Sequence, residues 1–62
     1  MKIPKEITES VALEILANLA AVKDDPERNH SLADTTLVAF IRGLGHGDVA
    51  DLWESVNPKW YA

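Results

Sequence analysis

The sequence contains no cysteine, so the chain forms no disulfide bond and offers no thiolate ligand to a metal. Basic residues are also few, with six lysines and arginines against ten acidic residues, which gives a formal net charge of −4. No two of them are adjacent, whereas nucleic-acid-binding proteins usually gather basic residues on one face. We therefore expect a cytoplasmic protein in a reducing compartment, without affinity for nucleic acid.

Long apolar runs are missing as well. No stretch approaches the roughly 20 apolar residues that span a bilayer. Glu6, Glu9 and Glu14 interrupt the region where a signal peptide needs an unbroken apolar segment. We accordingly expect no membrane association and a complete chain that forms one domain of 62 residues. A domain this short buries little surface, so oligomerisation is its remaining means of gaining stability.

Patterns that carry catalysis or ligand binding are sparse. The glycines of Gly43–Gly47 lack the strand and the Gly-Lys-Ser/Thr sequence of a phosphate-binding loop. His30, His46 and Asp48 fall short of the four ligands of a structural zinc site. Glu14 lies on a polar strip and is interpreted as a solvated carboxylate. We expect no enzyme activity, no cofactor, no bound metal and no small-molecule substrate.

The first helix is the most clearly marked element. No glycine or proline interrupts residues 5–25, and alanine, leucine and glutamate dominate there. Pro4 suits a first helical turn, which predicts a helix from about Pro4 to Val22 or Lys23. An alternative start has Thr8 as the N-cap residue.

Apolar side chains cover roughly 240° of this first helix, whereas a one-sided contact needs little more than about 100°. The large ones are Ile7, Val11, Leu13, Ile15, Leu16, Leu19 and Val22. We therefore expect this helix to form the centre of the fold and to be covered on two sides. The cover is either a second copy of the chain or the two following helices of the same chain.

Residues 24–30 are polar and are predicted to form a loop; a single helical turn capped by Asp25 is the alternative. Ser31 to Asp34 has the form of a capping box and predicts the start of the second helix. Gly43 is expected to end that helix in the left-handed conformation. Its expected apolar stripe consists of Ala33, Leu37, Phe40, Ile41 and Leu44.

A third, short helix is predicted from Val49 to about Val56, with Asp48 as its cap and Trp53 in the core. An aromatic tail follows, in which Trp60 and Tyr61 are expected to pack back onto the core; the alternative is an exposed interaction anchor. The fold class is therefore a small all-α domain of three helices with an aromatic C-terminal tail.

Residues 38–56 resemble a helix-turn-helix. The spacing that carries the resemblance is that of Ala39, Gly43, Val49 and Leu52. Arg42 departs from the pattern, which has an apolar residue there. The helix that would read DNA in this pattern also holds three acidic residues and no basic one, so phosphates would be repelled. An ordinary helical corner is the favoured interpretation, and a DNA-binding regulator that uses residues 38–56 is the alternative function.

The sequence as a whole favours a small acidic interaction or regulatory module of the kind common among phage and bacterial accessory proteins. It is expected to form a homodimer through the first helix. The expected self-association residues are Val11, Leu13, Ile15, Leu16, Leu19 and Val22. The expected surface for a further protein partner consists of Asp48, Asp51, Glu54, Trp60 and Tyr61.

Overall fold

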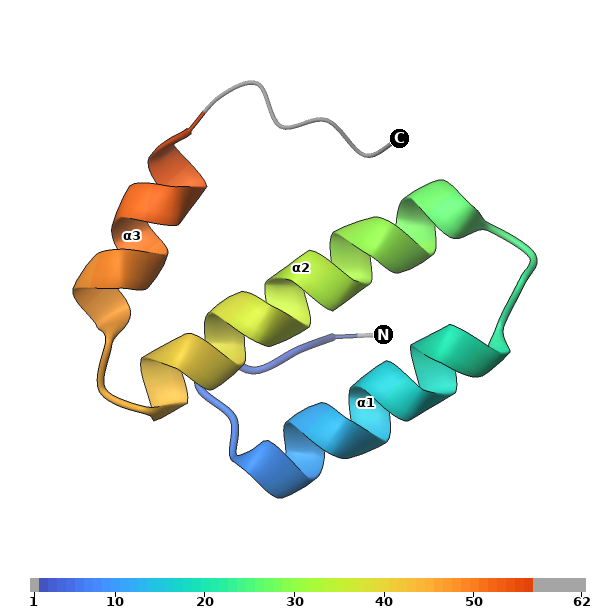
Figure 1. Ribbon diagram of the computed structural model, residues 1–62, viewed down its shortest axis with the longest axis horizontal. Coiled ribbons are helices and arrows are strands. Elements are labelled where there is room, and N and C mark those ends of the chain that lie inside the picture. Colours follow the sequence, from blue (N-terminus) through green and yellow to red (C-terminus); the bar gives the residue numbers. More distant parts are fainter. Residues whose placement is uncertain (1, 57–62) are drawn as a thin grey trace.

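The computed structural model describes residues 2–56, which form three helices and no strand: α1 (Glu9–Ala21), α2 (Pro26–Gly43) and α3 (Gly47–Ser55) (Figure 1). The predicted small all-α domain of three helices is thereby confirmed. The tail residues Trp60 and Tyr61 lie outside the described residues. None of the helices in residues 2–56 combines the length and apolar character needed to cross a membrane.

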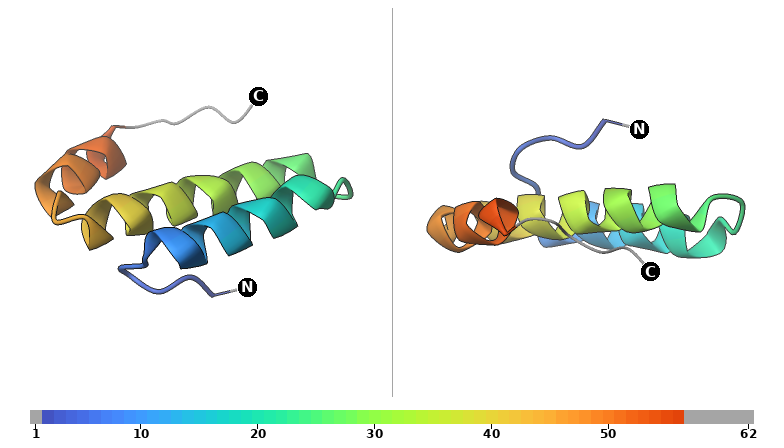
Figure 2. Two further views of the ribbon diagram at one scale, coloured as in Figure 1. Left: turned by 60° about the horizontal axis from the view of Figure 1, so that its bottom comes forward. Right: turned by 90° about the horizontal axis from the view of Figure 1, so that it is seen from above.

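The centre of the fold is α2, not the first helix as expected. Both α1 and α3 pack against α2, and they do not contact each other. The two lie on opposite sides of α2, so the helices form a single layer, seen edge-on in the right-hand view of Figure 2. The thinnest dimension of the molecule is accordingly only 15 Å. The interpretation in which the second and third helices cover the first on both sides is therefore wrong.

The first helix begins at Glu9, which selects Thr8 as its cap over a start near Pro4. The side-chain oxygen of Thr8 accepts a hydrogen bond from the backbone N–H of Val11 (3.3 Å). The residues before Thr8 are not helical, and the backbone N–H of Ile7 instead donates to the carbonyl oxygen of Ala39 on α2 (3.2 Å). The helix is shorter than expected because its first predicted turn is used to bind α2.

The second helix begins at Pro26, five residues before the predicted capping box. Asp25 is its cap and accepts a hydrogen bond from the N–H of Arg28 (3.1 Å), and the proline occupies the first turn. The side-chain amide of Asn29 donates to the carbonyl of Val22 (2.8 Å), which joins the two helix ends. The polar residues 24–30 were predicted to form a loop, but residues 26–30 are the first part of α2. Ser31, predicted as a cap, therefore lies inside the helix.

The end of α2 is a Schellman motif centred on Gly45 rather than Gly43. The N–H of His46 donates to the carbonyl of Ile41 (3.1 Å), and the N–H of Gly45 donates to that of Arg42 (3.0 Å). Among the described residues, only Gly45 has a positive φ, at 90°. The left-handed stop predicted at Gly43 therefore lies two residues further along the chain.

The third helix begins at Gly47, with His46 as a cap residue that makes no side-chain capping bond. Asp48 was expected to be the cap, but it lies in the first turn, where its carboxylate accepts from the N–H of Val49 (2.9 Å). An acidic residue in this position is favourable because the helix dipole is positive at its N-terminus. The helix ends at Ser55, one residue before the predicted end.

Small residues form the contacts between the helices. Thr36 is fully buried at the middle of α2, and its hydroxyl donates to the carbonyl of Leu32 (2.8 Å). Ala12 and Ala39 are buried beside Ile7 in the core cluster, and Ala50 is the buried residue of α3. Small side chains allow helix axes to approach closely, which leaves much of each larger side chain outside the contact. Leu37 and Leu44, predicted to belong to the apolar stripe of α2, are exposed because they lie on a different side of this helix from the buried Thr36 and Ala39.

Gly43 is required by the close approach of the N-terminal segment rather than by a turn. A Cβ atom at this position would overlap the backbone carbonyl of Ile7. The hydrogen bond from Ile7 to Ala39 holds this carbonyl against the last turn of α2. A backbone group cannot move aside as the end of a flexible side chain can, so any side chain at Gly43 displaces the segment.

We predict that Gly43→Ala lowers the free energy of unfolding by about 1–3 kcal/mol, as overpacking does. The sign is diagnostic, because glycine to alanine in a helix usually stabilises by about 0.5–1 kcal/mol. Urea unfolding at one fixed protein concentration measures the change.

The matched control is Gly47→Ala, whose added Cβ would lie 3.7 Å from its nearest neighbour, the Arg42 side chain. This substitution should leave stability unchanged or slightly raised. Equal effects of the two substitutions would contradict the close approach of Ile7.

Candidate functional site

The apolar stripe predicted for self-association is divided by the fold. Leu19 is buried, and Ile15 packs against the core cluster of Ile7, Ala12 and Ala39. Val11 and Val22 are exposed, and Leu16 is half-buried. Leu13 is 62% exposed, and it lies about 110° around α1 from the centre of the buried side. The stripe therefore supplies both the packing against α2 and an exposed remainder.

The exposed remainder continues from α1 onto α2. Leu16 and Ala20 of α1 and Ala33 of α2 line one cavity of about 550 Å³ between the two helices. On α1, Leu13 lies one turn before Leu16. On α2, Leu37 and Leu44 lie four and eleven residues after Ala33, so they share its side of the helix. All of these residues therefore lie on the same side of the helix pair. We call this side the open face; it consists of Leu13, Leu16, Ala20, Ala33, Leu37 and Leu44. The three leucines at 13, 37 and 44 are 62%, 47% and 58% exposed.

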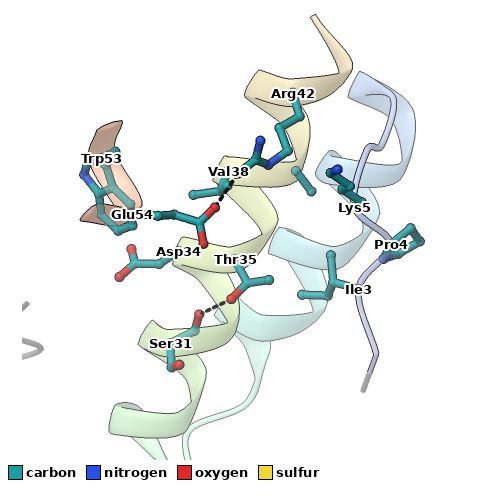
Figure 3. A pocket seen from close by; sticks show the side chains of 11 residues that line it. Ile3, Pro4, Lys5, Ser31, Asp34, Thr35, Val38, Arg42, Trp53 and Glu54 are labelled. Atoms are coloured by element: carbon teal, nitrogen blue, oxygen red, sulfur yellow. Dashed lines mark hydrogen bonds and ion pairs between the residues drawn. The ribbon is translucent and has the colours of Figure 1, made fainter. Parts of the chain in front are cut away.

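The opposite side of the helix layer is covered by the N-terminal segment, residues 2–8. Figure 2 shows this segment leaving the plane of the helices on one side only. Ile3 and Ile7 belong to the core cluster with Ala39 and Ile15. Ile3 also lies beside Thr35 in the cavity drawn in Figure 3. The segment thus shields one side of the α1–α2 pair, and the open face lies on the other.

The third helix is attached to α2 by an ion-pair cluster. The guanidinium of Arg42, on a side chain that is only 15% exposed, contacts the carboxylates of Asp51 (2.8 Å) and Glu54 (2.6 Å). Figure 3 shows Arg42 reaching from α2 to Glu54 on α3. Arginine supplies several donors in one plane, so a single side chain can bind both carboxylates. The expected partner surface therefore has two of its acidic residues turned toward α2.

Hydrogen bonds to Glu54 and then to Asp51 raise the pKa of Arg42 above its ordinary value. The stability gained from a raised pKa is fully present below the ordinary value and is lost as the pH rises through the raised one. The cluster therefore keeps its cation throughout the neutral range, and only strongly alkaline conditions remove it.

The arginine was noted in the sequence only as a departure from the helix-turn-helix pattern. Its role in attaching α3 was missed. The available signal was one basic residue at the end of a helix, followed by two acidic residues three positions apart in the next helix.

The outer side of α3 carries an exposed apolar row. Val49, Leu52, Trp53 and Val56 are 54%, 72%, 43% and 60% exposed. We call these four residues the α3 ridge. Trp53 was predicted to lie in the core, but it is partly exposed, and of α3 only the small Ala50 is buried. One side of Trp53 borders the cavity drawn in Figure 3.

The same exposure alters the helix-turn-helix interpretation. That resemblance requires Val49 and Leu52 to pack inward, but both face outward and Ala50 takes the buried position. Ala39 is buried as the resemblance expects, although its neighbour is Ile7 of the N-terminal segment. Residues 39–52 therefore form a helical corner whose buried residues differ from those of a helix-turn-helix.

The cavity between the N-terminal segment, α2 and α3 has a volume of about 350 Å³ and a mixed lining (Figure 3). The arginine in its lining is Arg42, whose guanidinium already binds Asp51 and Glu54. His30 lies in the first half of α2 and His46 follows its end. Within residues 2–56, no three His, Cys, Asp or Glu side chains are grouped as a metal site.

No family model matches this chain, and neither the curated proteins nor the solved structures contain a match to it. Function is therefore inferred from the two exposed apolar surfaces, the open face and the α3 ridge.

We predict that Arg42→Met releases α3 from α2 while the α1–α2 pair stays folded. Methionine keeps most of the apolar stem but has no charge with which to bind Asp51 and Glu54. Amide hydrogen exchange should show protection lost across Gly47–Ser55 and retained in α1 and in the middle of α2.

Arg28→Met is the control, since it removes the same charge from an exposed position near the start of α2. It should leave the protection of α3 unchanged. Full protection of α3 in Arg42→Met would show that the ion pairs do not hold the helix.

Proposed function

We propose that this protein is a small, non-catalytic interaction module that forms a homodimer through the open face. The observation that carries the proposal is the single layer of helices, which covers one side of the α1–α2 pair with the N-terminal segment and leaves leucines exposed on the other. Large exposed apolar patches on soluble domains typically mark sites of association.

Charge favours a second copy as the occupant of the open face. None of the six side chains that define it is charged, and Lys23, which also lines the cavity between α1 and α2, lies beyond the end of α1. Two copies can therefore meet there without like-charge repulsion across the centre. The rest of the chain is acidic, with a net charge of −4, and α3 alone carries three carboxylates and no basic residue. Two copies that met through α3 would bring like charges together, which disfavours that arrangement.

The energetics of burying such a patch suit a reversible dimer, taking about 400 Å² as the apolar area buried. Burying about 400 Å² of apolar surface contributes about 10 kcal/mol. Association costs about 4–15 kcal/mol in lost freedom of motion, so the net affinity is modest. A two-fold arrangement uses the same patch on both copies, as most homodimers do. The gain also offsets the small core, which in residues 2–56 has few buried side chains other than alanine.

The proposal refines the self-association surface expected from the sequence. Leu13 and Leu16 remain in it, whereas Leu19 and Ile15 pack within the chain. Val11 lies one turn before Ile15, on the flank of α1 nearest the N-terminal segment. Leu37 and Leu44 of α2 join the surface in their place.

We predict that Leu13→Glu shifts the protein from a dimer to a single species of 6.8 kDa in sedimentation at low micromolar concentration. Leu13 is largely exposed, so the substitution should change the stability of the isolated monomer by less than about 0.5 kcal/mol. Leu16→Glu should weaken both the dimer and the monomer, because Leu16 is half-buried.

Glu14→Ala is the control, because it changes a neighbouring exposed residue on the outer side of α1. This variant should sediment like the unmodified protein. A clean 6.8 kDa species from the unmodified protein, or an unchanged dimer from Leu13→Glu, would contradict dimerisation through the open face.

A further inference from the structure

The α3 ridge has the spacing of a helix that is bound by another protein. Its members lie at positions i, i+3, i+4 and i+7 (Val49, Leu52, Trp53 and Val56), which places all four on one side of the helix. This spacing is the recurring pattern of helices that lay an apolar side against an apolar partner surface. Tryptophan at the second turn adds the residue type most enriched at the centres of interfaces.

The same helix is oriented by contacts on its inner side. Ala50 is buried against α2, and Arg42 binds Asp51 and Glu54. These contacts leave Val49, Leu52 and Val56 outside the contact with α2, while Trp53 borders the cavity between α2 and α3. They also hold the helix in place before a partner binds. A pre-ordered helix loses less conformational entropy on binding than a segment that must fold at that moment.

Charge identifies the kind of partner that fits the ridge. Asp48 lies beside the ridge in the first turn, whereas Asp51 and Glu54 lie on the inner side of α3, where both bind Arg42. With three carboxylates against this single arginine, α3 remains acidic. An apolar partner surface flanked by basic residues complements this pattern, whereas an acidic one is repelled. A second copy of this chain offers α3 an acidic surface and is therefore disfavoured here.

We propose that α3 binds a different protein, by packing the α3 ridge against an amphipathic helix whose apolar stripe is flanked by lysine or arginine. The site is separate from the open face, so one dimer presents two α3 helices to two such partners. This inference goes beyond self-association and depends on the proposed function only in treating the chain as an interaction module.

The test uses the full chain and a synthetic amphipathic peptide with leucines at i, i+3, i+4 and i+7 and lysines on both flanks. Isothermal titration gives the affinity, and NMR chemical shifts locate the site. We expect shifts centred on residues 48–56, and at least tenfold weaker binding of a matched peptide in which glutamates replace the lysines.

Leu52→Glu separates packing on the ridge from simple charge attraction. The added carboxylate strengthens a purely electrostatic interaction with a lysine-rich peptide, but it disrupts apolar packing at the most exposed member of the ridge. We expect affinity to fall about tenfold, with α3 still helical because Leu52 faces outward. Val49→Glu, on the preceding turn, should also lower the affinity for the peptide.

Leu13→Glu carries the same substitution on the open face and distinguishes this inference from the proposed function. It should abolish the dimer yet leave peptide affinity within about twofold. Unchanged or stronger binding by Leu52→Glu, equal binding of the two peptides, or shifts centred on the open face would overturn the assignment. Loss of the dimer in Leu52→Glu would show instead that the ridge is an interface between copies.

Discussion

The whole arrangement depends on α2 as the one element that every other described element contacts. α1 packs along one side of it, α3 binds near its end, and the N-terminal segment lies across its last turns. Each contact requires close approach, and the residues that permit it are small: Thr36, Ala39 and Gly43 on α2, with Ala12 and Ala50 opposite. Because the contacts are made through small residues, most of the larger side chains of α1 and α3 stay partly or largely exposed, with Leu19 as the buried exception.

The single layer follows from this constraint, and it leaves the two sides of the domain unequal. One side has the N-terminal segment, which supplies Ile3 and Ile7 as cover. The other has exposed leucines from α1 and α2. At the edge of the layer, α3 combines an apolar ridge with carboxylates. The uncharged surface suits a copy of itself and the acidic one suits a basic partner, so the two surfaces do not compete for one occupant.

The number, order and helical nature of the elements were predictable, because propensity and apolar spacing act locally. Helix ends were less so. Pro4 suited a first turn, yet the helix begins only after Thr8, and the N–H of Ile7 donates to the carbonyl of Ala39 on α2 instead. Asp25 and Pro26 begin α2 despite the polar sequence that follows them. Gly43 was interpreted as a turn residue. Its actual role, leaving room for the backbone carbonyl of Ile7, depends on the tertiary structure and is not visible in the local sequence.

The candidate site was predictable in part for the same reason. The excess apolar arc on α1 indicated exposed hydrophobic residues, and Leu13 and Leu16 are among those the structure exposes or half-exposes. Periodicity alone does not say which side of a helix meets its neighbour. It therefore placed Leu37, Leu44 and Trp53 inside, and it gave Arg42 no role. The direction of packing was decided by where the small residues lie, which is a relation between helices rather than within one.

The bond between Ile7 and Ala39 also joins two parts of the chain that are far apart in sequence. α1 and the start of α2 meet through residues close in sequence, and such local contacts form quickly. The N-terminal segment makes a long-range contact instead, because its binding site consists of the last turns of α2. Its closure carries the entropic cost of a long loop, which the already formed helix pair largely removes. Residues 2–8 therefore depend on a binding site that lies about 30 residues further along the chain, and Ile3 and Ile7 lose their apolar cover whenever the last turns of α2 unfold.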